Sequence, residues 1–197
     1  MEPLETERLV IRALEMTDLE PVQQAVWADP KVAVPFGGRT RSLEETRQWL
    51  IARIWQVTRD QAPGYYAVVR KEDRKLIGVF TLSMFLAHFL RLEGDPDPER
   101  NALEVELGYA IGTAYQRRGY ATEAGKALIQ YAFEKLKLRR LISGAEESAN
   151  PASYHLARKL GFRMVRNTHP RWAGMVGVLY NPSVTGQEQS AEEQRSR

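Results

Sequence analysis

The sequence predicts an α+β fold in which helices flank one mixed sheet. Segments with strand periodicity and segments with helical periodicity follow one another in the order β-α-α-β-β-β-loop-α-β-α-β-β. In the middle of that order a half-buried strand, a tight loop and an amphipathic helix lie over residues 103–136. The chain has 197 residues, enough for one well-buried core. We therefore expect a single domain over residues 1–184, followed by a flexible polar tail over 185–197.

The chain opens with a short strand over residues 8–14, where polar and apolar side chains alternate. Thr17 and Glu20 then have the spacing of a capping box, which indicates the start of a helix. Asp29-Pro30 is expected to end that helix, because proline lacks the N–H group that a continuing helix requires.

A second capping box, Ser42 with Glu45, predicts the start of a longer helix. Trp49 and Trp55 lie in this helix, and both are expected to pack in the core. Base stacking by these two tryptophans is disfavoured, since basic residues do not interleave with them as they do in a nucleic-acid groove.

The next segments predict a hairpin followed by an irregular excursion. Residues 65–69 and 76–83 are rich in strand-forming side chains and flank a charged turn. From Met84 to Asn101 the pattern is lost, and two Asp-Pro steps forbid a continuous helix or central strand. We expect the excursion to shape an acceptor site or a homodimer contact and to contribute little to the core.

The last third predicts a strand, a helix and two closing strands. Residues 140–145 form the strand, and Asn150-Pro151 places a cap residue before a proline at the first helical position. Gly161 is the expected C-terminal cap of that helix. The closing strands are predicted at 162–165 and 177–180.

The central strand, loop and helix have the properties of an anion site. Leu103, Val105 and Leu107 alternate with polar residues, as in a half-buried strand. Gly119 lets the backbone approach a ligand, and the first turn of the following helix offers N–H groups without helical partners. Arg117 and its neighbour Arg118 add positive charge.

Two common phosphate motifs do not fit this loop. A Walker A motif requires four residues between its glycines, whereas Gly119 and Gly125 enclose five. The Rossmann fingerprint requires three closely spaced glycines, and this turn has one. The pattern Gln-x-x-Gly-x-Ala, from Gln116 to Ala121, instead resembles the pyrophosphate loop of the GNAT superfamily of acyl-CoA-dependent N-acyltransferases.

Further segments, spread over residues 4–180, resemble the RimJ/RimL-type branch of that superfamily. They are Glu5-Thr6-Glu7-Arg8-Leu9, Asp18-Leu19, Asp29-Pro30, Leu76-Ile77-Gly78-Val79, Glu106-Leu107-Gly108-Tyr109, Tyr120-Ala121-Thr122-Glu123-Ala124, Asn150 with Ser153, and Lys159-Leu160-Gly161-Phe162. The resemblance implies a mostly antiparallel sheet whose fourth and fifth strands splay apart.

The resemblance also implies acetyl-CoA as the acyl-donor cosubstrate, without a metal. Its pantetheine arm is expected to lie along the splayed strand edge, on Leu107, Tyr109 and Ile111. Asn150 and Ser153 are expected to contact the pantetheine from the other side. The diphosphate is expected on the loop and the first helical turn, at Gln116, Arg117, Arg118, Gly119, Tyr120, Ala121 and Thr122.

The chemistry implied is direct transfer of an acetyl group to a primary amine. Glu106 is the preferred group to draw a proton from the ammonium, and Glu104 is the alternative on the same strand face. Many relatives protonate the leaving thiolate with a tyrosine at the position held here by Ala157. Ser153 is the expected replacement, and Tyr154 is a weaker one, since its helical direction differs by about 100°.

Composition excludes several other classes of protein. The chain has no cysteine, which rules out disulfides and a thiolate nucleophile, and its three histidines lack metal-ligand spacing. The net charge of +3 is modest: it allows a polyanionic ligand and does not by itself indicate nucleic acid, which we do not expect as the main partner. Without an apolar run of membrane length or a leader-like start, we expect a soluble, cytoplasmic protein.

Two functions remain after these exclusions. One is an N-acetyltransferase that acts on a protein N-terminus or on a small-molecule amine. The alternative is an acyl-CoA-binding sensor or partner protein on the same fold, which Ala157 and the excursion motivate. The identity of the acceptor is not legible from the sequence.

Overall fold

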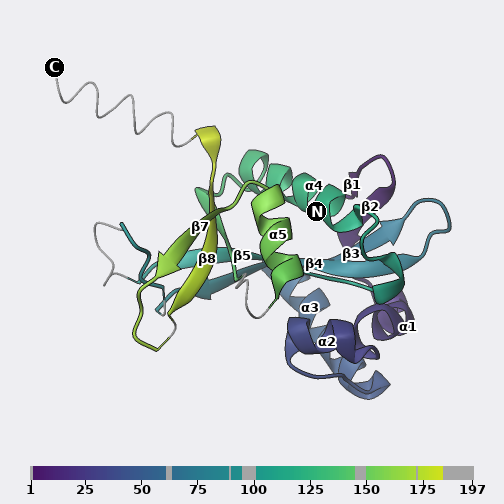
Figure 1. Ribbon diagram of the computed structural model, residues 1–197. Helices are drawn as coiled ribbons and strands as arrows, with labels where there is room; N and C mark the ends of the chain where they lie inside the picture. Colours follow the sequence, from purple (N-terminus) through teal and green to yellow (C-terminus); the bar gives the residue numbers. More distant parts are fainter. Residues whose placement is uncertain are drawn as a thin grey trace. The chain divides into compact units, whose positions relative to one another are not determined.

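The computed structural model describes residues 2–60, 64–88, 90–94, 101–144, 150–171 and 173–183 (Figure 1). Two compact units divide the chain. The first comprises residues 1–85 and 105–127, and the second comprises residues 86–104 and 128–197. The predicted tail at 185–197 lies outside the described residues. Single-domain organisation stays a prediction.

The first unit is built on strands in the order β1-β2-β3-β4-β5. The pairs β1 with β2, β2 with β3, and β3 with β4 are antiparallel. The predicted hairpin is confirmed in β3 and β4. Gly78 allows β4 to pass close to β5, because a Cβ atom at this position would overlap the carbonyl oxygen of Ala110. The bounds are β1 Leu4–Glu5, β2 Leu9–Ala13, β3 Tyr65–Arg70, β4 Leu76–Leu86 and β5 Leu103–Ile111.

The first helical segment begins earlier than predicted. A 3₁₀ turn, η1 (Met16–Asp18), leads into α1 (Leu19–Val22) and a π-helical stretch, η2 (Gln23–Trp27). The capping box predicted for Thr17 and Glu20 is wrong, because Asp18 takes the role: its carboxylate accepts the backbone N–H of Glu15 at 2.9 Å. Arg12 holds that buried carboxylate through two hydrogen bonds of 2.7 and 2.8 Å.

Asp29-Pro30 follows the end of the first helical segment at Trp27, as predicted, and it also begins the next helix. The helix is α2 (Pro30–Gly37), and the Asp29 carboxylate accepts the backbone N–H of Lys31 at 2.9 Å. Pro30 occupies the first helical position, where a missing N–H group costs nothing. Proline thus acts here as a start signal.

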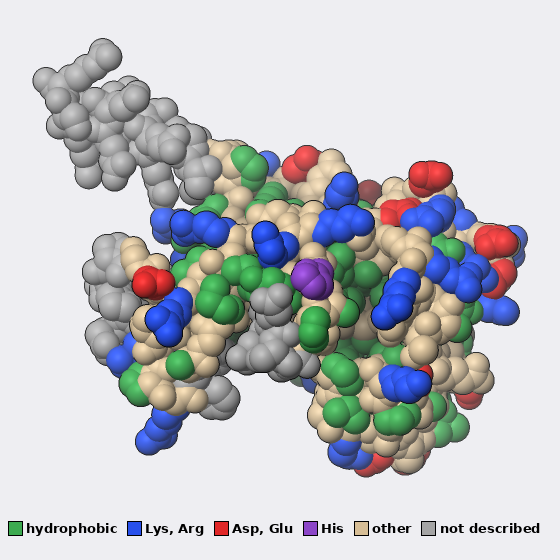
Figure 2. All heavy atoms as spheres, viewed as in Figure 1, with side chains coloured by type: hydrophobic (Ala, Val, Ile, Leu, Met, Phe, Trp, Pro, Cys, Tyr) green, Lys and Arg blue, Asp and Glu red, His purple; other side chains and the backbone are tan. Residues whose placement is uncertain are grey.

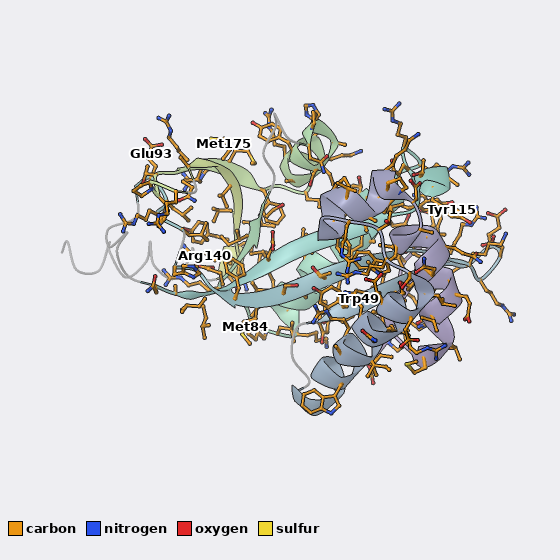
Figure 3. The ribbon with its side chains drawn as sticks, turned by 90° about the horizontal axis from the view of Figure 1, so that it is seen from below. Trp49, Met84, Glu93, Tyr115, Arg140 and Met175 are labelled. Atoms are coloured by element: carbon orange, nitrogen blue, oxygen red, sulfur yellow. The ribbon has the colours of Figure 1, made fainter. Side chains whose placement is uncertain are left out.

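Helix α3 (Leu43–Asp60) confirms the second capping box. The backbone N–H of Ser42 donates to the Glu45 carboxylate at 2.7 Å, and the N–H of Glu45 donates to the Ser42 hydroxyl at 3.2 Å. Trp49 packs in the core, against Trp27 at 5.2 Å between ring centroids (Figure 3). Trp55 is 62% exposed, contrary to expectation, because six residues turn a helix by about 240° and face it away from the core.

In Figure 1, helices α1, α2 and α3 gather on one side of β3 and β4. Their buried side chains form one hydrophobic cluster with residues of η2, of β3, β4 and β5, and of the segment after β2. The members are Leu14, Leu19, Val22, Val26, Trp27, Val32, Ala33, Trp49, Leu50, Ala67, Leu76, Val79 and Ala110. This core supports the strand edge and the loop that carry the predicted site in the first unit.

The second unit contains the strand order β6-β8-β7, with both pairings antiparallel. Helix α4 begins in the first unit and ends in the second. The predicted closing strands and the glycine cap are confirmed, since Gly161 follows α5 with a left-handed φ of 96°. The bounds are α4 Tyr120–Glu134, β6 Arg140–Ser143, α5 Pro151–Lys159, β7 Arg163–Asn167 and β8 Gly174–Tyr180.

The excursion contributes to the core, contrary to expectation. Its first residues, Met84 to Leu86, continue β4. Leu92 is buried in a hydrophobic cluster with Ile142, Val176 and Val178. Hydrogen bonds of 2.8 Å fix the backbone of its neighbour Arg91 to the Asn167 side chain and the Thr168 backbone. The two Asp-Pro steps lie outside the described residues.

The α+β class is confirmed by these helices and mainly antiparallel strands. The fourth and fifth strands of the predicted sheet correspond to β5, most of which lies in the first unit, and β6, which lies in the second. Their splay is not visible within either unit alone, and it stays a prediction.

Candidate functional site

The loop between β5 and α4 has the backbone shape of an anion site. After Ile111 the chain makes a 3₁₀ turn, η3 (Thr113–Tyr115). Gln116 then closes the turn by donating its side-chain amide to the carbonyl oxygen of Ile111 at 2.8 Å. Arg117 and Gly119 follow with left-handed φ angles of 59° and 84°. A non-glycine residue rarely adopts this conformation, and such residues gather at ligand sites.

The start of α4 supplies the donors that such a site requires. The first helical hydrogen bond runs from the N–H of Glu123 to the carbonyl oxygen of Gly119 at 3.0 Å. The N–H groups of Tyr120, Ala121 and Thr122 therefore precede the hydrogen-bond ladder of the helix. The 15 residues of α4 direct the positive end of its dipole at the same point. Backbone donors, a helix dipole and exposed arginines at 117 and 118 fit a diphosphate.

A hydrogen-bonded cluster of Thr6, Arg8 and Glu123, which the sequence did not predict, contacts this loop. The carboxylate of Glu123, in the first turn of α4, accepts hydrogen bonds from the Thr6 hydroxyl at 2.6 Å and the Arg8 backbone N–H at 2.8 Å. Arg8 also donates Nε to it at 2.7 Å. Burial alone would raise the pKa of Glu123, but these donors outweigh burial and leave the pKa below its ordinary value. The carboxylate is thus charged and fully engaged.

Tyr115 joins the loop to the neighbouring turn between β3 and β4. Arg70, at the end of β3, lies over the ring of Tyr115 at 5.2 Å (Tyr115 in Figure 3). Asp73 holds Arg70 by hydrogen bonds of 2.7 and 3.0 Å, and Arg70 lowers the pKa of Asp73 to about 2. Acidic and basic side chains are accordingly intermixed around this turn in Figure 2.

Strand β5 carries the predicted cofactor edge and the predicted base. Leu107 and Ile111 are buried, and the ring of Tyr109 stacks on Phe80 at 5.3 Å. These contacts fix the strand whose backbone is expected to meet the pantetheine. Glu106 is half-buried on this strand, next to Leu107.

Glu104, the alternative base, is committed to another partner. Its carboxylate is 4% exposed and accepts two hydrogen bonds of 3.0 Å from Nε of Arg140 and a further short one from Nη2. The pair raises the pKa of Arg140, which therefore stays charged. Glu104 is unsuited to accept a proton.

The other predicted site residues lie at the start of α5, in the second unit. The side-chain oxygen of Asn150 accepts the backbone N–H of Ser153 at 3.1 Å, which confirms Asn150 as the helix cap. Its side-chain NH₂ group remains a donor. Ser153 is half-buried, while Ala157, one turn further on, is buried.

A depression of about 490 Å³ also lies in the second unit. Its lining comprises Glu93, Arg163, Met164, Val165, Arg166 and Met175, of which Glu93 and Met175 are labelled in Figure 3. The predicted site residues are not part of this lining.

Comparison with known proteins shows the family of the chain. A family model described as an acetyltransferase (GNAT) domain matches residues 8–163. The chain belongs to the GNAT family of acetyltransferases. It is similar to the uncharacterised N-acetyltransferase p20 of Bacillus licheniformis, with 29% identity over 168 residues and 83% of each chain covered. The prediction of an N-acetyltransferase enzyme is therefore confirmed.

Solved structures confirm the GNAT fold. A proposed ribosomal-protein-serine acetyltransferase of Vibrio cholerae is 25% identical, with a TM-score of 0.69 and coverage of 90% of this chain and 97% of that chain. RimL, a ribosomal L7/L12 alpha-N-protein acetyltransferase in complex with coenzyme A, is 17% identical, with a TM-score of 0.68 and coverage of 91% and 98%. At that identity the likeness to RimL is one of fold.

Within the described part of the chain, the helices are too short or too polar to span a bilayer.

Proposed function

We propose that this GNAT enzyme uses acetyl-CoA to acetylate a primary amine by direct transfer. The observation that carries the proposal is the loop from Gln116 to Gly119, which leads into the N–H groups at the start of α4 that precede the helical hydrogen-bond ladder. Seven residues from Gln116 to Thr122 are proposed to hold the diphosphate. Leu107, Tyr109 and Ile111 are proposed to line the pantetheine, and Asn150 and Ser153 to contact it.

Acetyl-CoA supplies the acetyl group as a thioester, whose C–S bond breaks as the C–N bond to the amine forms. Glu106 is proposed to take the proton that the ammonium must lose, through water. The backbone N–H near Leu107 is proposed to polarise the thioester oxygen. Ser153 is proposed to donate its hydroxyl proton to the leaving sulfur and to regain a proton from the amine nitrogen, which loses its second proton as the amide forms. Ala157 carries no hydroxyl and cannot take this role.

The acceptor is proposed to be a protein N-terminus or a small-molecule amine. The RimJ/RimL-like text at residues 5–9 and the similarity in fold to ribosomal-protein acetyltransferases support the N-terminus. A cytoplasmic location and a homodimer belong to the same proposal. Ala157 favours one alternative, an acyl-CoA-binding protein that does not turn over.

The test is thiol release from acetyl-CoA with a panel of acceptors that includes ribosomal-protein N-terminal peptides and polyamines. Saturable, acceptor-dependent release is expected for at least one peptide. Release with small amines alone would reject the N-terminal acceptor. Calorimetric binding of coenzyme A without acceptor-dependent release across the panel would favour the alternative.

The proposed diphosphate site at the loop between β5 and α4 is tested separately with Gly119→Val and the matched variant Gly38→Val. Both glycines have left-handed φ angles, of 84° and 80°, so both substitutions strain the backbone similarly. Gly38 caps the C-terminal end of α2, so Gly38→Val is expected to lower stability without changing the affinity for coenzyme A. Gly119→Val is expected to weaken coenzyme A binding at least about tenfold. Equal affinities of the two folded variants for coenzyme A would reject the proposed diphosphate site.

A further inference from the structure

The contacts of Arg8 single it out among the residues around the loop. Its guanidinium donates Nη1 to the carbonyl oxygen of Arg118 at 3.1 Å and pairs Nη2 with the Glu123 carboxylate at 2.6 Å. It also lies 4.6 Å from the ring centroid of Tyr120. One side chain from the turn before β2 therefore contacts the loop, the first residue of α4 and the carboxylate in the first turn.

The bond to Arg118 controls the direction of a neighbouring donor. The peptide between Arg118 and Gly119 is trans, so its C=O and N–H groups point in opposite directions. Because Arg8 holds the carbonyl oxygen, the N–H of Gly119 points away from Arg8. A Cβ atom at 119 would lie 3.2 Å from Nη2 of Arg8, so a larger residue there would crowd the Arg8 guanidinium.

The bonds to Glu123 remove a competitor from the anion site. A carboxylate in the first turn of a helix is attracted to the same N–H groups as a phosphate. Here the donors of Arg8 and Thr6 occupy both oxygens of Glu123, at distances of 2.6 to 2.8 Å. A carboxylate accepts about four hydrogen bonds, so this one is saturated. The positive charge of Arg8 also offsets the repulsion between the Glu123 carboxylate and a bound diphosphate.

We propose that Arg8 is a positioning residue for the binding of acetyl-CoA. It directs the N–H of Gly119 toward the diphosphate and holds the Glu123 carboxylate out of the anion site. This role rests on the proposed function of the loop. Arg8 acts through the loop and the carboxylate, without contact with the diphosphate itself.

The test is calorimetric titration with coenzyme A of wild type, Arg8→Ala, the double variant Arg8→Ala/Glu123→Gln, and Arg39→Ala. The last is a matched control, because Arg39 pairs with Glu45 at 2.8 Å elsewhere in the first unit. Arg8→Ala is expected to weaken binding about tenfold, the effect of losing one charge-assisted hydrogen bond. Arg39→Ala is expected to bind like wild type.

The double variant separates positioning from a purely structural role. Removing the charge of Glu123 from a site without Arg8 is expected to restore binding about threefold relative to Arg8→Ala, because the competing anion is gone. A structural role predicts binding equal to or weaker than that of Arg8→Ala, and either result overturns the proposal. Unchanged affinity in Arg8→Ala overturns it as well.

Thermal melting without ligand establishes that each variant is folded. If Arg8→Ala does not fold, Arg8→Lys replaces it, since lysine keeps the charge but cannot reach both acceptors with a planar fork. Wild-type affinity in Arg8→Lys then overturns the proposal. A wild-type protein that does not bind coenzyme A rejects the proposed function instead, so the two failures are distinguishable.

Discussion

Glu104 and Glu106 lie two positions apart on β5 with the same sequence context, but Arg140 binds one of them. Alternation along a strand predicts that their side chains share a face, and it says nothing of a partner 36 residues away. Local features fared better: the caps at Ser42 and Asn150 were predictable because each bonds three residues along. The pairing of Arg8 with Glu123 spans 115 residues and left no local signal.

At the residue scale, Glu106→Gln is expected to lower kcat/KM about a hundredfold or more at neutral pH, since the amide cannot accept the ammonium proton. Coenzyme A affinity is expected to stay within about twofold, because the carboxylate serves the acceptor. Steady-state kinetics with a productive acceptor and calorimetry measure the two effects.

The exposed glutamate Glu44 provides the control, and Glu44→Gln is expected to keep wild-type kinetics. Wild-type kcat with a raised KM in Glu106→Gln would assign this residue to acceptor binding instead.

At the scale of elements, helix type was predictable and helix starts were only partly so. Asp-Pro is compatible both with the end of one helix and with the start of the next, and periodicity does not distinguish them. The buried ion pair of Arg12 with Asp18 likewise decided where the first helical segment begins. In α3 the capping box is exposed and local, and prediction and structure agree.

That capping box makes helix α3 sensitive to acid. Arg39, followed by the Ser42 backbone and hydroxyl, lowers the pKa of Glu45 from 4.5 to about 2. A depressed folded-state pKa stabilises the protein above pH 4.5, and this contribution is lost as the pH falls toward 2. Glu45→Gln is therefore expected to lower Tm by a few degrees at pH 7, with the difference vanishing near pH 2.

Circular-dichroism melts of both proteins across this pH range measure the difference. Glu44→Gln, which changes the neighbouring glutamate outside the capping box, is the control. A Tm difference for Glu45→Gln that is the same at pH 7 and pH 2 would contradict the assignment of the pKa shift.

At the scale of the whole molecule, the order of strands and helices was enough to predict the α+β fold class. Several short sequence motifs were enough to predict the family. The excursion was misjudged because Leu92 is a single apolar residue between charged neighbours, which shows no periodicity. Its burial depends on strands 50 to 86 positions later in the chain.

Leu92→Ala is expected to lower the free energy of unfolding by about 2–3 kcal/mol, through lost burial and the cavity left among Ile142, Val176 and Val178. Leu103→Ala is the control, since that side chain is 71% exposed and its loss is expected to change stability by less than about 0.5 kcal/mol. Urea denaturation measures both. Equal stabilities would place Leu92 outside the core.

The ion pair between Arg8 and Glu123 also has an evolutionary consequence. A relative that loses the arginine keeps an unneutralised carboxylate beside its proposed diphosphate site, which weakens the binding of acetyl-CoA. The glutamate is then expected to be replaced in turn. Positions 8 and 123 are therefore expected to covary among relatives, more strongly than either does with the exposed arginines of the loop. A relative with a complete Gln-x-x-Gly-x-Ala pattern and an unmatched glutamate is expected to bind its donor poorly, although its loop would pass any search for the motif.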